Sequence, residues 1–156
     1  MQTSSISQIK KELQSLPQER LLELCIAMAK YKKENKEVLD YLLFRAHDEV
    51  AYVLMVKDEI AILFQEINLN SVFFVKKSLR KILRLVNKYS KYSNKASTSV
   101  ELLLYFCQQL KASKIDYKSN LTIANIYQNQ IKKIQKEISK LHEDLQFDYE
   151  QELSEL

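Results

Sequence analysis

The sequence predicts an all-α protein, with six to seven antiparallel helices arranged as an irregular bundle or as a HEAT-like array of helical hairpins. Apolar residues recur every three or four positions along most of the chain, which is the period of an amphipathic helix. No segment shows the strict alternation of apolar and polar residues that is typical of a half-buried strand. Glycine is absent and Pro17 is the only proline, so few residues interrupt helices.

The composition predicts one domain over residues 1–156. Hydrophobic residues make up 46% of the chain and charged residues 28%, so the chain can build a core and keep a charged surface. A domain of this length buries roughly two-thirds of the surface that its unfolded chain exposes. No stretch rich in proline, glycine or serine divides the sequence.

Three helices are expected near the N-terminus, at residues 5–14, 17–33 and 36–44. Proline favours the first turn of a helix because its missing N–H has no partner there in any case, so Pro17 is expected to open the second helix. Asn35 is expected to be its stop or a cap. Apolar residues spaced by three and four give each helix one apolar face.

Residues 9–43 carry a leucine pattern at helical spacing. The segments are Ile9-Lys-Lys-Glu-Leu-Gln-Ser-Leu-Pro-Gln-Glu-Arg-Leu-Leu-Glu-Leu24 and Lys36-Glu-Val-Leu-Asp-Tyr-Leu-Leu43. This pattern resembles the opening of a family of small, uncharacterised all-helical bacterial proteins that look like helical-repeat domains. The resemblance implies a helical fold, and the family has no activity to carry over.

Two longer helices are expected in the middle of the chain, at residues 48–67 and 72–92. Asp48 is a suitable N-cap because its carboxylate can accept from free backbone N–H groups of the first turn. Residues 68–71 contain two asparagines, which replace glycine best where the backbone needs a positive φ. Helix 72–92 has apolar residues outside its main seam, so we predict that it contacts more than one neighbour and is the central element.

In the last third of the chain, the sequence predicts a helix capped by Ser97 or Thr98, a loop at 112–117, and a long final helix at 119–149. At about 1.5 Å per residue the final helix would be roughly 45 Å long. Its apolar positions form a narrow seam, as in a coiled coil. The candidate helix-pairing residues are Ile131, Ile134, Ile138, Leu141 and Leu145. The seam either packs against the chain's own helices or pairs with a second copy or another helical partner.

Eight basic residues and no acidic residue lie between positions 76 and 95. The candidate anion or partner surface consists of Lys76, Lys77, Arg80, Lys81, Arg84 and Lys88, followed by Lys91 and Lys95. Four like-charge pairs at i,i+4 destabilise this helix by roughly 1–2 kcal/mol in isolation. Either the acidic segment 143–156 or an external anion, such as a nucleic acid or an acidic protein, would relieve that repulsion.

No catalytic, cofactor-binding or metal-binding residue is predicted. Without glycine there is no phosphate-binding loop and no dinucleotide fingerprint. His47 and His142 lack the Glu-x-x-His spacing of di-metal bundles, and no Cys-x-x-Cys occurs. Cys25 and Cys107 each lie in an apolar helical stretch, and we expect free buried thiols in a reducing compartment.

These observations predict a non-enzymatic cytoplasmic protein that acts through helical surfaces on another protein, or as a homodimer. The alternative is a nucleic-acid-associated protein that uses the basic residues 76–95. A protein partner or self-association is expected ahead of nucleic acid. No membrane span, small-molecule substrate or cofactor is expected, because the longest apolar runs are far too short to cross a bilayer and no reactive site is visible.

Overall fold

The computed structural model describes residues 3–156, and within that range it contains eight helices and no strand, which confirms the all-α class. Contacts divide the chain into two compact units, Met1–Phe44 and Arg45–Leu156, called here the N-terminal unit and the C-terminal unit. The prediction of a single domain over residues 1–156 stays a prediction.

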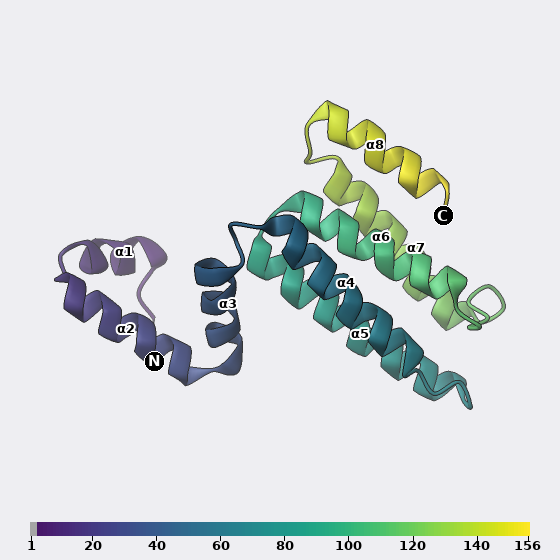
Figure 1. Cartoon of the computed structure of the whole chain (residues 1–156), viewed down its shortest axis with the longest axis horizontal. Helices are drawn as coiled ribbons and strands as arrows, with labels where there is room; N and C mark the ends of the chain where they lie inside the picture. The colour runs from purple at the N-terminus through teal and green to yellow at the C-terminus, as the bar shows by residue number, and fades with distance from the viewer. Residues whose placement is uncertain (1–2) are drawn as a thin grey trace. The chain divides into compact units, whose positions relative to one another are not determined.

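The N-terminal unit consists of α1 (Ile6–Gln14), α2 (Gln18–Tyr31) and α3 (Lys33–Phe44) (Figure 1). A capping box starts α1: the Ser5 side chain accepts from the Gln8 backbone N–H at 3.3 Å, and Gln8 Oε1 accepts from the Ser5 N–H at 2.9 Å. Pro17 is the N-cap of α2, whose first helical residue is Gln18, whereas the sequence predicted Pro17 itself in the first turn of the helix. Helices α2 and α3 pack against each other.

The sequence predicted that Asn35 would be a stop or a cap after α2. In the structure α2 has already ended, and Asn35 lies inside α3. The turn is made at Lys32, whose backbone is extended with φ −142° and ψ 146°. The Asn35 side chain then donates from Nδ2 to the carbonyl of Met28 at 2.9 Å. Asn35 therefore satisfies a free carbonyl near the end of α2 from the following helix.

The C-terminal unit consists of α4 (Glu49–Gln65), α5 (Val72–Ser93), α6 (Ala96–Ala112), α7 (Leu121–Ile138) and α8 (Glu143–Ser154). Successive helices run back and forth as antiparallel neighbours (Figure 1). This agrees with a helical bundle, whereas a HEAT-like array is not confirmed. Among the helices of residues 3–156, each is too short or too polar to span a bilayer.

The sequence predicted helix 72–92, which is α5, as the central element. In the structure the central element is α6. Helix α6 packs against α4, α5, α7 and α8, whereas the main contacts of α5 are with α4 and α6. The reason lies in the charge distribution. Helix α5 carries basic residues along one side, so it buries one face, while α6 has Glu101 and Lys111 as its only charged residues. Its buried residues are Thr98, Ser99, Val100, Leu102, Leu103, Leu104, Phe106, Cys107 and Leu110.

The helix ends follow the chemistry of their caps. Asp48 caps α4 as predicted, with Oδ1 accepting from the Ala51 N–H at 3.0 Å. In the part of the chain that is described, Asn94 is the one residue with positive φ, at 55°, and it forms the left-handed C-cap of α5. The expected positive φ in 68–71 is not seen, since Asn68 Oδ1 accepts from the Asn70 N–H at 2.9 Å in a local turn.

The single helix predicted at 119–149 is not confirmed, because two helices stand in its place. Helix α7 ends at Ile138, where the Ser139 hydroxyl donates to the carbonyl of Lys136 at 2.9 Å. Such a local bond competes with continuation of the helix. The chain then reverses, and α8 packs back on α7 and α6. This break raises the helix count above the six to seven expected.

Candidate functional site

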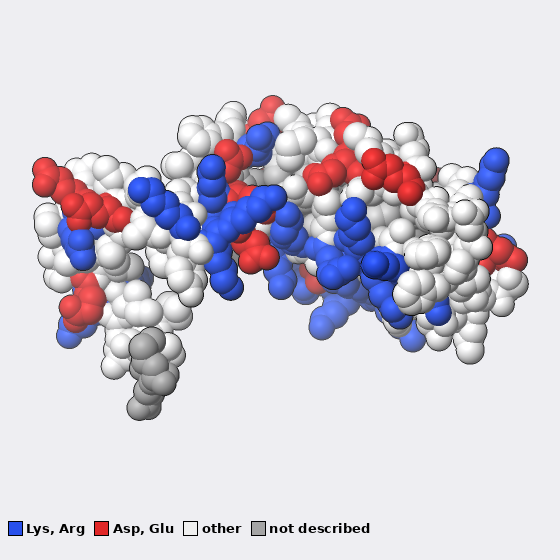
Figure 2. Space-filling model, turned by 90° about the horizontal axis from the view of Figure 1, so that it is seen from below, with Lys and Arg blue, Asp and Glu red and all other residues white. Residues whose placement is uncertain are grey.

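A continuous basic surface covers the solvent side of α5. The basic face, as we call Lys76, Lys77, Arg80, Lys81, Arg84 and Lys88, lies opposite the buried residues of the same helix. Those buried residues are Val75, Leu79, Ile82 and Val86. Lys77, Arg80, Lys81 and Arg84 are exposed, and α5 contains no acidic residue. Figure 2 shows Lys and Arg atoms gathered on the side of the molecule that is turned to the viewer.

The acidic C-terminal segment does not cover this face with ion pairs. Its six acidic residues lie on or directly after α8, which packs against α7 and α6. One of them, Asp144, lies 3.5 Å from His142 Nδ1, a contact that is an ion pair only when the histidine is protonated. Other links from this segment go to α6, where Tyr149 Oη donates to Glu101 Oε1 at 3.2 Å and Lys111 Nζ donates to the carbonyl of Glu155 at 2.9 Å.

Several members of the basic sequence run have partners within the chain, and one of them is Arg84, whose Nε donates to the carbonyl of Arg80 at 3.4 Å. Lys95 lies beyond the end of α5, and its Nζ binds Glu49 Oε2 at 2.9 Å. Lys88 Nζ lies 4.7 Å from the ring centroid of Tyr89 and 6.0 Å from that of Tyr92, which are cation–π distances. The most solvent-accessible charge of the basic face is therefore concentrated at residues 77–84.

Lys133 of α7 places one further basic side chain beside α5. Lys133 Nζ donates to Asn87 Oδ1 of α5. Burial lowers the pKa of the Lys133 ammonium, Glu137 raises it, and the charges of Lys91 and Lys140 lower it further. Lys140 itself pairs with Glu137 at 2.7 Å. Sequence reasoning missed this group because its members come from two helices that are distant in the chain.

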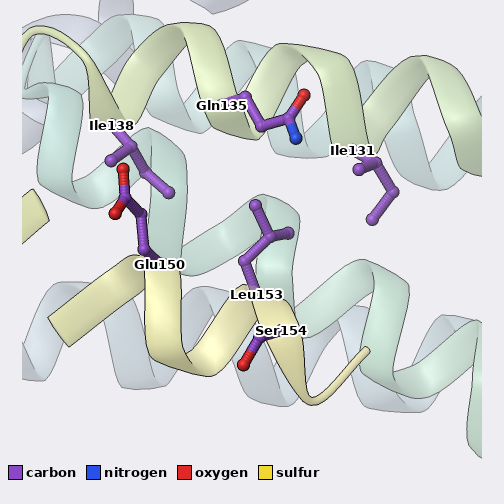
Figure 3. A pocket seen from close by; sticks show the side chains of 6 residues that line it. All are labelled: Ile131, Gln135, Ile138, Glu150, Leu153 and Ser154. Atoms are coloured by element: carbon purple, nitrogen blue, oxygen red, sulfur yellow. The ribbon is translucent and has the colours of Figure 1, made fainter. Parts of the chain in front are cut away.

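The predicted helix-pairing seam is used largely inside the chain. Ile134 and Ile138 are buried at 0% and 2% exposure, Ile131 and Leu141 are half-buried, and Leu145 is 42% exposed. Between α7 and α8 lies a pocket of about 410 Å³. Its lining residues are Ile131, Gln135, Ile138, Glu150, Leu153 and Ser154 (Figure 3). Ile134 and Ile138 therefore pack within the chain, whereas pairing of the seam with a second copy or another helical partner stays a prediction.

A second pocket, the N-terminal groove, lies within the N-terminal unit and has a volume of about 380 Å³. Its lining residues are Leu13, Leu21, Leu24, Cys25, Met28, Ala29, Asn35, Val38, Leu39 and Leu42. Asn35 is the polar exception, and its amide already donates to the carbonyl of Met28. The groove therefore offers an apolar surface without a charged side chain.

Apolar residues near the groove remain exposed. Neither α1 nor α2 buries any residue. On α1, Ile6 is 80% exposed and Ile9 43%, and on α2, Leu22 is 63% exposed and Ile26 44%. A unit of this size has little capacity for a core of its own, so a further apolar surface would stabilise it.

The two cysteines are unpaired but differ in environment. Cys107 is buried in α6, and burial raises the pKa of its thiol from an ordinary 9.0 to about 12. Cys25 is exposed at the N-terminal groove, so the prediction of two buried thiols is wrong for this residue. Among residues 3–156, no group of three or more His, Cys, Asp or Glu side chains lies close enough to hold a metal ion.

Glu49 joins three polar side chains that the sequence did not connect. Its Oε1 accepts from Ser93 Oγ at 2.5 Å and from Thr98 Oγ1 at 2.6 Å, and its Oε2 accepts from Lys95 Nζ. The sequence predicted a helix cap at Ser97 or Thr98, but α6 begins earlier, at Ala96, and both residues lie inside it. This network holds the junction of α5 and α6 against the first turn of α4.

In comparisons with known proteins, no family model, no curated protein and no solved structure matches this chain. The resemblance of residues 9–43 to a helical bacterial family therefore stays a prediction. The surfaces that remain to be explained are the N-terminal groove and the basic face.

Proposed function

We propose that this chain is a non-enzymatic cytoplasmic protein that acts by protein–protein contact, and that the N-terminal groove is the contact surface. The supporting observation is an apolar groove without charged lining, formed by helices of which two bury no residue. Exposed apolar surface of this kind is typical of protein interaction sites. The two unpaired cysteines are consistent with a reducing compartment.

An amphipathic helix fits the groove better than a small molecule does. Small-molecule sites combine apolar walls with a few free polar groups that orient the ligand. Here the polar lining residue, Asn35, already donates to Met28, so no such group is evident. The apolar surface also continues along α1 through Ile9 to Ile6. A helix with apolar anchors at i, i+3 and i+7 would cover both the groove and this row.

The occupant that we propose is α1 of a second copy. Its apolar residues Ile6, Ile9 and Leu13 follow the i, i+3, i+7 spacing of a groove-binding helix. Ile6 is 80% exposed, so it contributes little to packing within its own unit. Two copies that pack these α1 helices against each other's grooves would form a two-fold dimer, in which each groove receives the partner's α1.

The mass of the protein in solution and the reactivity of Cys25 test this proposal together. Light scattering coupled to gel filtration, over about a hundredfold range of concentration, is expected to show a monomer that converts to a dimer. Because Cys25 lines the groove, its reaction with a thiol reagent is expected to slow as the dimer forms. A double variant, Ile6→Lys with Ile9→Lys, is expected to stay monomeric and to keep a fast Cys25 reaction at every concentration.

A matched control removes equally exposed apolar residues from the C-terminal unit. Leu54 and Ile62 on α4 are 56% and 55% exposed. The double variant Leu54→Lys with Ile62→Lys should dimerise like the natural sequence. If the protein of natural sequence stays monomeric, and if the rate at which Cys25 reacts with the thiol reagent does not depend on protein concentration, pairing through the groove is contradicted. Dimerisation that the control variant abolishes and the Ile6 and Ile9 variant preserves would place the contact on α4 instead.

A further inference from the structure

We propose that the basic face of α5, together with the exposed Phe73 and Phe74, binds single-stranded nucleic acid. This binding site lies wholly in the C-terminal unit. It does not depend on the N-terminal groove or on the pairing proposed above. The proposal rests on the arrangement of charge along α5, on the position of the two aromatic rings and on the burial of the apolar side of the helix.

The charges of the basic face are spaced to follow a phosphate backbone. From Lys76 to Lys88 the helix rises about 18 Å, at about 1.5 Å per residue, and at least one basic residue is present on each turn. Lys77, Arg80, Lys81 and Arg84 are exposed and have no acidic neighbour on α5. Like-charge pairs at i,i+4 destabilise α5 when nothing is bound to the basic face, because the side chains repel each other. A bound polyanion would relieve this repulsion.

Two phenylalanine rings stand at the N-terminal end of this row. Phe73 is 64% exposed and Phe74 is 45% exposed, with ring centroids 5.6 Å apart and ring planes inclined by 72°. Phe73 precedes Lys77 by four positions, so both residues lie on the same side of α5. Proteins that bind single strands combine a basic track with exposed aromatic rings on which bases stack. The N-terminal half of α5 carries both features.

The positive surface does not end at α5. The Lys133 ammonium of α7 reaches α5 through its bond to Asn87 Oδ1. Lys91 follows the basic face on the next turn of α5 and is exposed. A strand that runs from Phe73 along the basic face would thus meet further positive charge at the C-terminal end of the helix. Such an extended field attracts a polyanion before any direct contact forms.

An anionic membrane is a poorer fit for this surface. A helix that lies in a membrane interface needs an exposed apolar face along its length. The apolar side of α5 faces the core instead: Leu79 and Val86 are 0% exposed and Ile82 is 1% exposed. A duplex is also a poorer fit, because its bases are stacked inside and would leave Phe73 and Phe74 without a role.

Fluorescence anisotropy with a labelled oligo(dT) of about 20 nucleotides tests the proposal, since this length exceeds the roughly 4–16 nucleotides of common single-strand sites. The full chain is expected to bind the oligonucleotide. Its affinity should fall with salt on a log–log slope of about −3, the value for roughly four phosphate contacts on a single strand. A duplex of the same length, and vesicles of anionic phospholipid, should bind more weakly than the single strand.

Two variants assign the contacts. Arg80→Gln with Arg84→Gln should weaken binding about tenfold and reduce the salt slope by about one to two. Phe73→Ala with Phe74→Ala should weaken single-strand binding at least about fivefold and leave the salt slope unchanged, because stacking releases no counterion. The matched control is Lys10→Gln with Lys11→Gln, which removes the same charge from exposed positions on α1. It should bind like the natural sequence.

Several outcomes would overturn the proposal. Absence of binding at low salt would remove the site altogether. An equal loss of affinity in the Lys10 and Lys11 control would show attraction by net charge and not by the basic face. Equal or tighter binding of the duplex, with no effect of the Phe73 and Phe74 variant, would exclude single-strand recognition. Binding of anionic vesicles but not of the oligonucleotide would assign the face to a membrane.

Discussion

The Thr98 hydroxyl on α6 donates a hydrogen bond of 2.6 Å to the Glu49 carboxylate on the first turn of α4. Thr98 is 1% exposed, so this carboxylate replaces the water that its hydroxyl would otherwise bind. Glu49 also accepts from Ser93 and Lys95 at the junction of α5 and α6. One carboxylate therefore connects the ends of three helices, where apolar packing alone would leave polar groups unsatisfied.

Replacing Glu49 by alanine is expected to lower the free energy of unfolding by about 2–3 kcal/mol, because it removes charge-assisted hydrogen bonds and leaves the buried Thr98 hydroxyl with its weaker bond to Ser93 Oγ at 3.2 Å. Urea unfolding followed by circular dichroism measures the change. Glu66→Ala is the matched control, since Glu66 is exposed on the same unit, and it should stay within about 0.5 kcal/mol of the natural protein. Equal stability of the Glu49 and Glu66 variants would show that the network contributes nothing.

The local pattern of apolar residues predicted most of the helices. Val53, Val56 and Ile60 on α4 are buried as their spacing indicates, and so are Leu79 and Val86 on α5. Helical period and capping are properties of neighbouring residues, so they can be read from the sequence. The break after Ile138 could not be predicted in this way, because the apolar seam continues in register through Leu141 and Leu145 while the chain reverses.

The candidate surfaces were predictable to different degrees. The basic face follows from consecutive charges on one helix, and the sequence indicated it directly. The N-terminal groove was missed, because leucines at helical spacing look the same whether or not another helix covers them. The contact of Lys133 with Asn87 was also missed, since it joins residues that are 46 positions apart. Long-range contacts of this kind leave no local signal.

The two thiols are expected to react at very different rates. At low protein concentration and pH 8, a thiol reagent should modify Cys25 quickly and leave Cys107 intact, because Cys107 is buried and its raised pKa keeps the thiol protonated. Both should react in denaturant. Counting the thiols modified before and after unfolding checks this. Rapid modification of two thiols in the native protein would contradict the burial of Cys107.

Burial of Cys107 should also make stability fall at alkaline pH. Below pH 9 the thiol is protonated in both states and has no effect. Between its ordinary pKa of 9.0 and its folded value of about 12, the unfolded state loses the proton and the folded state keeps it, so unfolding becomes easier as pH rises. The expected contribution is up to about 1.4 kcal/mol per pH unit. Urea unfolding from pH 8 to 10.5 should show a steeper loss than in Cys107→Ala, and identical slopes would contradict it.

Replacing Lys77 by glutamate is expected to stabilise the protein. The change turns the like-charge pair of residues 77 and 81 into a favourable i,i+4 pair on an exposed face, which is worth about 0.4–1 kcal/mol. The gain should shrink in 1 M salt, where exposed charges are screened over about 3 Å. Thermal unfolding at two salt concentrations measures it. The control is Lys10→Glu on α1, and an equal gain there would assign the effect to net charge alone.

Helix α8 is expected to be the least protected helix of the C-terminal unit against amide hydrogen exchange. It contains no buried residue, and its attachment includes Leu153 at the pocket beside α7 and the Tyr149 bond to Glu101. Local opening therefore needs less free energy than opening of α6, whose side chains form the core. Exchange of residues 143–154 should be faster than exchange of α6, and mass spectrometry of the peptides can resolve the two.

Truncation of Leu153 separates attachment of α8 from its intrinsic helix stability. Leu153→Ala removes a half-buried side chain from the pocket and should speed exchange in α8 about fivefold, equivalent to about 1 kcal/mol, without changing exchange in α6. Phe147→Ala is the matched control, because Phe147 lies on the same helix and is 69% exposed. It should leave exchange nearly unchanged. Equal effects of the two variants would mean that α8 does not depend on the contact of Leu153 with α7, whereas acceleration by Leu153→Ala alone would identify that contact as its attachment.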